Sequence, residues 1–223
     1  MYQYKDDSLM LHNDLYQINM AESYWFDGIH ERKAVFDLYF RNMPFGSGYA
    51  VFNGLRRVIE FIENLHFSES DMAYLKSIGY QDDFLSYLKE LKFTGNIRSM
   101  QEGELCFSNE PLMRIEAPLI QAQLIETALL NIINFQTLIA SKASLIKQVA
   151  VDDVLMEFGT RRAHEFDAAV WGARAAIIGG FDSTSNVRAG KLFNIPVSGT
   201  HAHAFVQTYG DEYTAFKLSL IHI

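Results

Sequence analysis

The stretch from residue 118 to residue 150 constrains the fold more than any other part of the chain. It reads PLIQAQLIETALLNIINFQTLIASKASLIKQVA, with apolar residues at helical spacing along its length. Polar side chains interrupt it every few positions, namely Gln121, Gln123, Glu126, Asn131, Asn134 and Gln136. Each of these would be costly in lipid, which disfavours a membrane-spanning helix. We therefore predict a long buried helix, or two in series broken near Ser141, across a domain junction. Asn131 and Asn134 are interpreted as hydrogen-bonded core amides, and a role as site residues is the alternative.

The composition sets the broad class of the protein. The chain has 223 residues, of which 49% are hydrophobic, so it can form one large or two smaller domains with a packed core. A net charge of −8 argues against nucleic-acid binding, which needs clustered Lys and Arg. Cys106 is the single cysteine, so no internal disulfide forms, and the start Met1–Asp7 lacks an apolar signal core. These features predict a cytoplasmic globular protein without a membrane anchor.

The first part of the chain mixes strands and helices. Residues 33–40 read as a strand followed by a turn, and residues 58–65 and 70–91 read as helices with Ser68 and Ser70 as N-terminal caps. Short strands are expected near residues 97–100, 105–107 and 112–115. This order is typical of an α+β domain, which we place at residues 1–140.

The pattern of apolar and polar residues changes after residue 150. Three short apolar runs, at 154–158, 177–181 and 195–199, are each followed by a polar loop, with helices expected at 163–176 and up to Phe193. Such units predict a (β/α) barrel or an open α/β sheet. A closed barrel takes about 250 residues. We therefore expect residues 141–223 to form the first half of a barrel whose remainder is absent, or an open sheet with an exposed edge.

The three polar loops share a chemistry. The first, at 159–162, carries two guanidiniums suited to carboxylate or phosphate. The second, at 180–186, offers hydroxyls and backbone amides at a predicted helix N-terminus, where anions bind readily. The third, at 199–203, adds a hydroxyl and two imidazoles. Together they predict a rim that takes an anionic ligand.

The pair His201 and His203 has two functional interpretations. At a strand end, alternate residues point to one side and can bind a metal, as in a metallohydrolase, although no second dense His/Asp cluster accompanies them. Alternatively, one imidazole acts as a nucleophile that accepts a phosphoryl group. A purely structural histidine, exposed and capping at position 201, is the third possibility.

Six segments in collinear order, covering about residues 11–216, carry a family resemblance. They are NDLYQINM (13–20), FRNMPF (40–45), NIINFQTL (131–138), EFGTRRA (157–163), GGFDSTSNV (179–187) and GTHAH (199–203). In these segments the chain resembles the N-terminal part of nicotinate phosphoribosyltransferases. Related enzymes that use nicotinamide have Asp-Ser-Tyr-Lys where this chain has Asp-Leu-Tyr-Gln at 14–17, which favours the nicotinate branch.

The resemblance implies a type II phosphoribosyltransferase, with a mixed N-terminal domain beside an irregular α/β barrel, usually as a homodimer. The implied reaction joins nicotinate to phosphoribosyl pyrophosphate, coupled to ATP hydrolysis with Mg²⁺, in the salvage synthesis of NAD. His203 matches the histidine that ATP phosphorylates. Tyr16 matches the aromatic residue that stacks on the pyridine ring, Thr200 a nicotinate contact, and Arg161 a guanidinium for the carboxylate or phosphates. The other implied substrate-binding residues are Gly159, Thr160, Ser183 and Asn186.

The chain also departs from the family. Ala204 stands where many relatives have Ser, and the ending 217–223 stops resembling them. We expect a truncated chain with a non-native ending, lacking the later phosphoribosyl-binding loops and inactive as a catalyst. Within the enzyme class, the alternative predictions are that nicotinamide or quinolinate, instead of nicotinate, is the substrate. A non-catalytic chain that binds a partner through its sheet edge is the alternative from another class, and a metallohydrolase ranks third.

Overall fold

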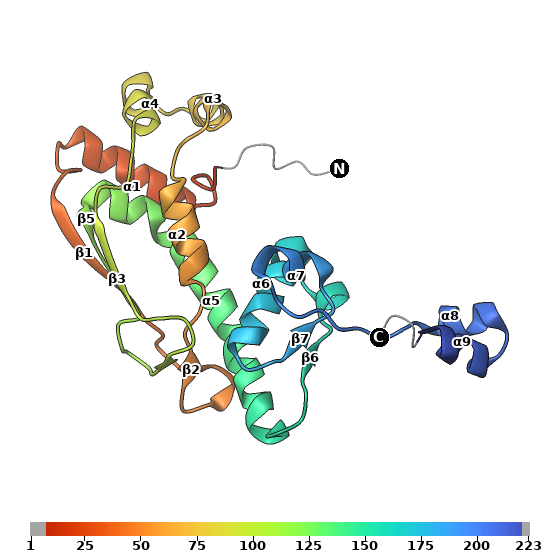
Figure 1. Ribbon diagram of the computed structural model, residues 1–223. Coiled ribbons are helices and arrows are strands. Elements are labelled where there is room, and N and C mark those ends of the chain that lie inside the picture. Colours follow the sequence, from red (N-terminus) through yellow and green to blue (C-terminus); the bar gives the residue numbers. More distant parts are fainter. Residues whose placement is uncertain (1–7, 220–223) are drawn as a thin grey trace. The chain divides into compact units, whose positions relative to one another are not determined.

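The computed structural model describes residues 8–219, so the start 1–7 and the last four residues of the predicted non-native ending lie outside the described part. Two compact units make up the chain, Met1–Leu138 and Ile139–Ile223. Both units mix helices and strands (Figure 1).

Antiparallel strands organise the first unit. Its main sheet has the order β1-β5-β3, with bounds Lys33–Leu38 for β1, Met113–Pro118 for β5 and Asn96–Ser99 for β3. The predicted strands are thus confirmed, and a two-stranded ladder of β2 (Ala50–Val51) and β4 (Leu105–Cys106) accompanies them. Across β1 and β5, Asp37 lies opposite Arg114 and accepts two hydrogen bonds from its guanidinium at 2.7 and 2.9 Å, which lowers the pKa of the Asp37 carboxyl.

Helices complete the first unit. They are α1 (Leu15–Phe26), α2 (Leu55–Glu63), α3 (Glu69–Ser77), α4 (Asp82–Lys89) and the beginning of α5 (Leu119–Ala150), with a short 3-10 turn, η1, at Pro44–Gly46. The predicted cap at Ser68 is confirmed, because its hydroxyl accepts from the Asp71 backbone while the Asp71 carboxylate accepts from the Ser68 backbone. The 70–91 stretch divides into α3 and α4 at Gly79, whose positive φ of 108° ends the first helix.

One continuous helix, α5, occupies the 118–150 stretch, with no break at Ser141. It follows β5 directly (Figure 1), and the boundary between the units falls within it. Its length and hydropathy would suit a membrane span, but 56% of its most apolar window is buried in the protein. Ile120, Leu124 and Ile133 on this helix are among the most deeply buried side chains of the first unit, so we assign α5 as a core helix.

The prediction for Asn131 and Asn134 is wrong. Both side chains are exposed, because they share the helix face of Leu130, itself 44% exposed, while Ile132 and Ile133 point into the core. Helical spacing assigns residues to faces but does not say which face is turned to solvent when apolar residues lie on both, as Leu130 and Ile133 do here.

The second unit has a parallel arrangement. Its elements are β6 (Met156–Glu157), the 3-10 turn η2 (Thr160–Arg162), α6 (Glu165–Ile178), β7 (Ser183–Thr184), α7 (Val187–Phe193), α8 (His203–Tyr209) and α9 (Glu212–Ser219). β6 pairs with β7 in parallel, and Thr184 forms a parallel bridge with Val197. The strand–loop–helix order is therefore confirmed, with strands of two residues.

The predicted strand at 177–181 is wrong. Ile177 and Ile178 end α6, and the chain closes there with a Schellman motif. The Phe181 N–H donates to the Ala176 carbonyl at 3.0 Å, the Gly180 N–H donates to the Ile177 carbonyl at 2.9 Å, and Gly180 has a φ of 104°. The strand instead begins at Ser183, within the segment predicted as a polar loop.

Cys106 is fully buried in β4, and burial raises the pKa of its thiol to about 11. We expect native protein to react with iodoacetamide at neutral pH far more slowly than protein unfolded in guanidinium chloride, because the thiolate is the reactive form. Mass spectrometry of the alkylated chain over time measures both rates. Equal rates in the two conditions would mean that Cys106 is accessible in the folded protein.

Candidate functional site

Polar turns follow the carboxyl ends of three parallel segments in the second unit, at 158–162, 185–186 and 198–203, and β7 itself takes up Ser183 and Thr184 of the loop predicted at 180–186. Glu157 pairs with Thr184, and Thr184 pairs in turn with Val197. The Thr184 N–H donates to the Pro196 carbonyl at 3.1 Å, and the Ser198 N–H donates to the Thr184 carbonyl at 3.0 Å. Because parallel segments point the same way, the residues that follow them emerge at one edge of the sheet, where ligands bind in α/β folds.

The first loop presents two guanidiniums. Gly159 precedes η2, and its carbonyl accepts a hydrogen bond from the Arg162 N–H at 2.8 Å. The side chains of Arg161 and Arg162 are exposed, and within residues 8–219 neither has a recorded ion pair. Two uncompensated guanidiniums on a fixed turn can bind a carboxylate or phosphate in a bidentate manner.

The second loop, predicted as a polar loop, is partly buried. Ser183, Thr184 and Asn186 are all buried. The Asn186 carboxamide caps α7 by accepting from the Ala189 N–H at 2.9 Å, and the Asn186 N–H donates to the Thr184 hydroxyl at 3.0 Å. These polar groups therefore support the loop from inside, and substrate binding by Ser183 and Asn186 stays a prediction.

The third loop leads into α8. Thr200 is exposed, and His203 is the exposed first residue of the helix. His201 is half-buried, with its ring centroid 5.7 Å from that of Phe205 and 5.4 Å from that of Phe216. Its Nδ1 lies 3.1 Å from the Ser219 hydroxyl. His201 is thus a packing residue of the α8–α9 pair, and not an exposed cap.

The structure does not support the argument that His201 and His203 bind a metal from the end of a strand. Residues 199–202 are not in a strand, so the alternation of side chains along a strand does not apply to them. Across residues 8–219 no group of three or more His, Cys, Asp and Glu side chains is arranged to hold a metal ion.

Tyr16 lies in the first unit, on α1, and its side chain is 53% exposed. Tyr16 is therefore not a core aromatic residue of the first unit. The Tyr16 hydroxyl accepts a hydrogen bond from Gln17 Nε2 at 3.1 Å. Buried Gln17 accepts in turn from Gln123 Nε2 on α5, and Gln123 also donates to the Glu126 carboxylate at 3.3 Å. A chain of amides thus holds the hydroxyl end of an otherwise exposed ring.

A groove in the first unit is lined in part by Asn131 and Asn134, whose alternative interpretation was as site residues. It has a volume of about 340 Å³ and is lined by Leu38, Tyr39, Phe40, Arg41, Leu130, Asn131, Ile133 and Asn134. Arg41 and the two asparagines are exposed there, so the groove joins an apolar floor to one guanidinium and two carboxamides. Two of the segments that carry the family resemblance, 40–45 and 131–138, contribute residues to this groove although they lie far apart in sequence. Their joint presence in the resemblance is the sequence feature that could have indicated the groove.

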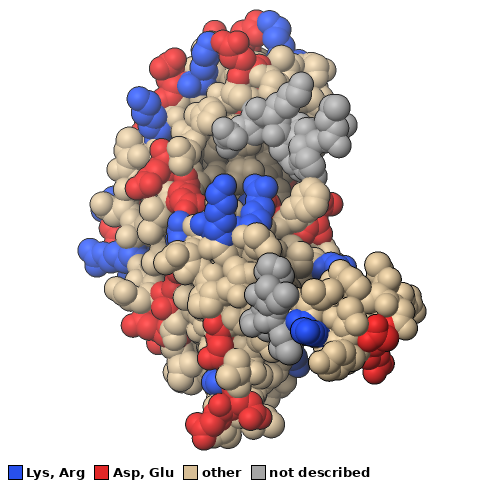
Figure 2. Space-filling model, turned by 45° about the vertical axis from the view of Figure 1, so that its right-hand side comes forward, with Lys and Arg blue, Asp and Glu red and all other residues tan. Residues whose placement is uncertain are grey.

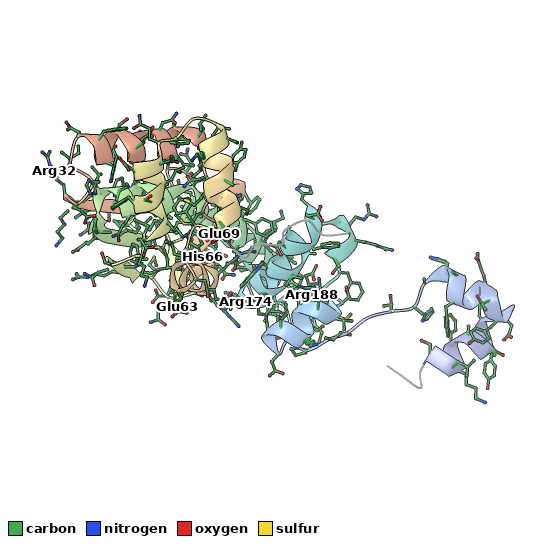
Figure 3. The ribbon with its side chains drawn as sticks, turned by 90° about the horizontal axis from the view of Figure 1, so that it is seen from above. Arg32, Glu63, His66, Glu69, Arg174 and Arg188 are labelled. Carbon is green, nitrogen blue, oxygen red and sulfur yellow. The ribbon has the colours of Figure 1, made fainter. Side chains whose placement is uncertain are left out.

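Figure 2 shows the charged side chains on one face of the molecule. In Figure 2 acidic and basic residues are interspersed over the visible surface. In the second unit Arg174 and Arg188, labelled in Figure 3, come from α6 and α7. The guanidinium carbon of Arg174 lies 5.8 Å from the centroid of the Phe193 ring.

Comparison with known proteins identifies the family. Residues 11–134 match the model of the nicotinate phosphoribosyltransferase (NAPRTase) N-terminal domain. The chain is 69% identical over 217 residues to the nicotinate phosphoribosyltransferase of Bacillus subtilis, covering 97% of this chain and 44% of that protein. It is 43% identical over 200 residues to that of Dictyostelium discoideum, covering 88% of this chain and 34% of that protein.

Solved structures agree with this match. The crystal structure of human nicotinic acid phosphoribosyltransferase superimposes with a TM-score of 0.83 at 36% identity, covering 88% of this chain and 40% of that one. A nicotinate-nucleotide pyrophosphorylase from Pyrococcus furiosus shares the fold, with a TM-score of 0.78 at 24% identity. The chain spans less than half the length of each of these relatives. Because the family model alone matches more than half of the chain, this protein belongs to the nicotinate phosphoribosyltransferase family.

Proposed function

We propose that this chain carries nicotinate- and phosphoryl-binding parts of an enzyme that joins nicotinate to phosphoribosyl pyrophosphate, giving nicotinate mononucleotide and pyrophosphate in the salvage synthesis of NAD. The observation that supports this best is the convergence of loops 158–162, 185–186 and 198–203 at one edge of a parallel sheet. The three short segments would begin the irregular α/β barrel of type II phosphoribosyltransferases. Residues 1–140 would form the mixed N-terminal domain.

The residues proposed to bind substrate would each contribute one kind of interaction with a flat acid, charge pairing in the second unit and ring stacking in the first. The Arg161 guanidinium takes the carboxylate or a phosphate, with Gly159 and Thr160 shaping the turn that presents it. Thr200 offers a hydroxyl from the third loop. Tyr16 offers an exposed ring face, and ring stacking adds about 0.5–1.5 kcal/mol beyond the burial of area. In glycosyl transfer of this kind, positive charge builds at the ribose C1 as pyrophosphate leaves, so positioning and charge neutralisation are the main contributions that residues can make.

His203 would couple this reaction to ATP. A neutral imidazole nitrogen offers a lone pair near pH 7, and the exposed position of His203 leaves its ring accessible. The imidazole attacks the γ-phosphorus, a nitrogen–phosphorus bond forms, the bond to the bridging oxygen breaks, and ADP departs with its electron pair. Water later takes the phosphoryl group and releases phosphate.

Other components follow from the same proposal. Mg²⁺ would be held mainly by the phosphates of the substrates, since Mg²⁺ in such sites needs few protein ligands. We propose a homodimer as the working assembly and the cytoplasm as its compartment. The buried free thiol of Cys106 agrees with a reducing environment.

Removing the Arg161 guanidinium should weaken nicotinate binding. We expect Arg161→Ala to raise the Kd for nicotinate about 10- to 150-fold, because hydrogen bonds to a charged group contribute about 1.5–3 kcal/mol. Nicotinamide, which lacks the carboxylate, should bind the unaltered protein more weakly and should lose little further affinity in the variant. Isothermal titration of the chain with nicotinate, nicotinamide and quinolinate measures all three.

Arg188→Ala is the matched control, because Arg188 is exposed on α7 of the same unit. Tighter binding of nicotinamide or quinolinate than of nicotinate would reassign the substrate. Absence of any pyridine binding would favour a non-catalytic chain.

A further inference from the structure

Glu157 is a carboxylate that the proposed site does not use, yet it touches two of the three loops. Its Oε1 accepts a hydrogen bond from the Gly159 N–H, and its Oε2 accepts from the Thr184 hydroxyl at 2.6 Å. Its own carbonyl accepts from the Ser185 N–H at 2.9 Å. One residue at the end of β6 therefore ties the start of the first loop to the start of the second.

The network continues inward from Thr184, which is fully buried. Because the Thr184 hydroxyl already accepts from the Asn186 N–H at 3.0 Å, its proton is directed to Glu157. Both partners of the Glu157 carboxylate are thus donors. An ionised carboxylate is the side chain that accepts at both oxygens, whereas a carboxamide accepts at only one.

The partners of Glu157 are neutral. Within the described residues 8–219, Glu157 forms no ion pair. Its carboxylate accepts from a backbone N–H and a hydroxyl instead of a neighbouring guanidinium. Arg161 and Arg162 on the adjacent turn therefore keep their charge available for a ligand. A direct Glu–Arg pair would instead compete with an anion for the same donors.

We propose that Glu157 is a positioning residue: its carboxylate, clamped between the Gly159 N–H and the Thr184 hydroxyl, sets the turn that presents Arg161 to an anionic ligand. This rests on the proposed function for the ligand but not for the clamp itself. The glycine at 159 fits the same picture, because a Cβ there would lie 2.7 Å from Glu157 Oε1. Such a Cβ would displace the end of one flexible side chain, and not a backbone.

Four variants test the clamp. Glu157→Gln keeps the shape and loses one acceptor. Thr184→Val keeps the shape and loses the hydroxyl, while Thr184→Ser keeps the hydroxyl. Gly159→Ala displaces the carboxylate. Asp152→Asn is the matched control, because it removes the same charge from an exposed residue in the same unit.

The first readout is amide hydrogen exchange at Gly159 and Arg162 in the whole chain, which needs no ligand. We expect exchange about tenfold faster in Glu157→Gln, Thr184→Val and Gly159→Ala, and unchanged in Thr184→Ser and Asp152→Asn. Unchanged exchange in the first three variants would overturn the proposal. So would equal loss of protection throughout the unit, since that would indicate a general structural role.

The second readout is affinity for nicotinate and for inorganic pyrophosphate. The three disruptive variants should weaken whichever probe binds by about five- to tenfold while the melting temperature stays close to that of Asp152→Asn. Recovery of affinity in Thr184→Ser separates the hydrogen bond from mere shape. If exchange changes as expected but the unaltered chain binds neither probe, the clamp stands and the proposed function fails. Unchanged affinity in variants whose loop has loosened would overturn the link from Glu157 to the ligand.

Discussion

In a version of the protein extended to the full length of its curated relatives, incubation with Mg²⁺ and ATP labelled at its γ-phosphate should give acid-labile label, and His203→Asn in that version should acquire none. An Asn side chain is close in size to imidazole but has no nucleophilic nitrogen, so the loss is expected to be complete and not graded. Exposure of His203 at the start of α8 makes the substitution mild for folding. Mass spectrometry under neutral conditions locates the modified residue, and phosphohistidine is distinguished from phosphoserine by its lability in acid.

Two further variants give this experiment its controls. His164→Asn removes an exposed imidazole elsewhere in the second unit and should leave labelling intact. His201→Asn tests the other member of the pair, whose ring packs against Phe205 and Phe216 and whose loss should lower stability more than labelling. Label that survives in His203→Asn, or that resides on His201, would reject the assigned nucleophile.

The meeting of the three loops could be foreseen because it depends on a local rule. Short apolar runs followed by polar residues and helices indicate parallel strands, whose carboxyl ends share an edge. That placed Arg161 after β6, and Thr200 and His203 after the segment of Val197, as observed, whereas the strand before the second loop was predicted at the wrong residues. Their chemical roles came from the resemblance and not from the spacing, and they stay predictions.

The errors have physical causes that composition and periodicity do not resolve. The run Ile-Ile-Gly-Gly-Phe at 177–181 has the residue types of a buried strand, yet Gly180 at positive φ makes it a helix end. Ser183 and Thr184 look like loop residues, but the Thr184 hydroxyl donates to Glu157 and accepts from the Asn186 N–H inside the protein, which helps a polar strand to be buried.

The groove of Arg41, Asn131 and Asn134 illustrates a different limit. Its two walls come from the end of β1 and from the middle of α5, and sequence periodicity says nothing about which distant segments meet. The outward face of α5 carries Leu130, which is apolar and 44% exposed, so residue type does not distinguish this face from the core face. Exposed apolar residues are common, so one such residue is weak evidence for a buried face.

The close approach of α6 to α5 makes Gly179 the position in the second unit where a single methyl group should cost most. A Cβ built there would lie 2.3 Å from the Ala140 carbonyl oxygen and 2.6 Å from the Ala143 Cβ. Both contacts belong to a rigid helix, so the overlap is relieved only by moving α6 away from α5. We expect Gly179→Ala to lower the free energy of unfolding of this unit by about 3 kcal/mol, at the upper end for overpacked cores.

The small core of the second unit makes this loss consequential. One buried cluster consists of Val170, Ala173 and Ala189 with Phe193 packed against them. The other buried apolar side chains described in this unit are all alanines, so little apolar area opposes unfolding. A loss of that size should lower the melting temperature by more than about 10 °C in a unit of this length. Urea titration followed by Trp171 fluorescence, in a Trp25→Phe background, reports on this unit alone.

Gly199→Ala is the matched control, because a Cβ at Gly199 meets nothing within 4 Å and the substitution should change stability by less than about 0.5 kcal/mol. Since α6 runs from the end of the Arg161 loop to the Schellman turn before β7, displacing it should also loosen the edge that carries the proposed site. Nicotinate affinity of Gly179→Ala, measured below its melting transition, should therefore fall with stability. Equal unfolding free energies for the two alanine variants would show that α5 and α6 do not approach as closely as Ala140 and Gly179 indicate.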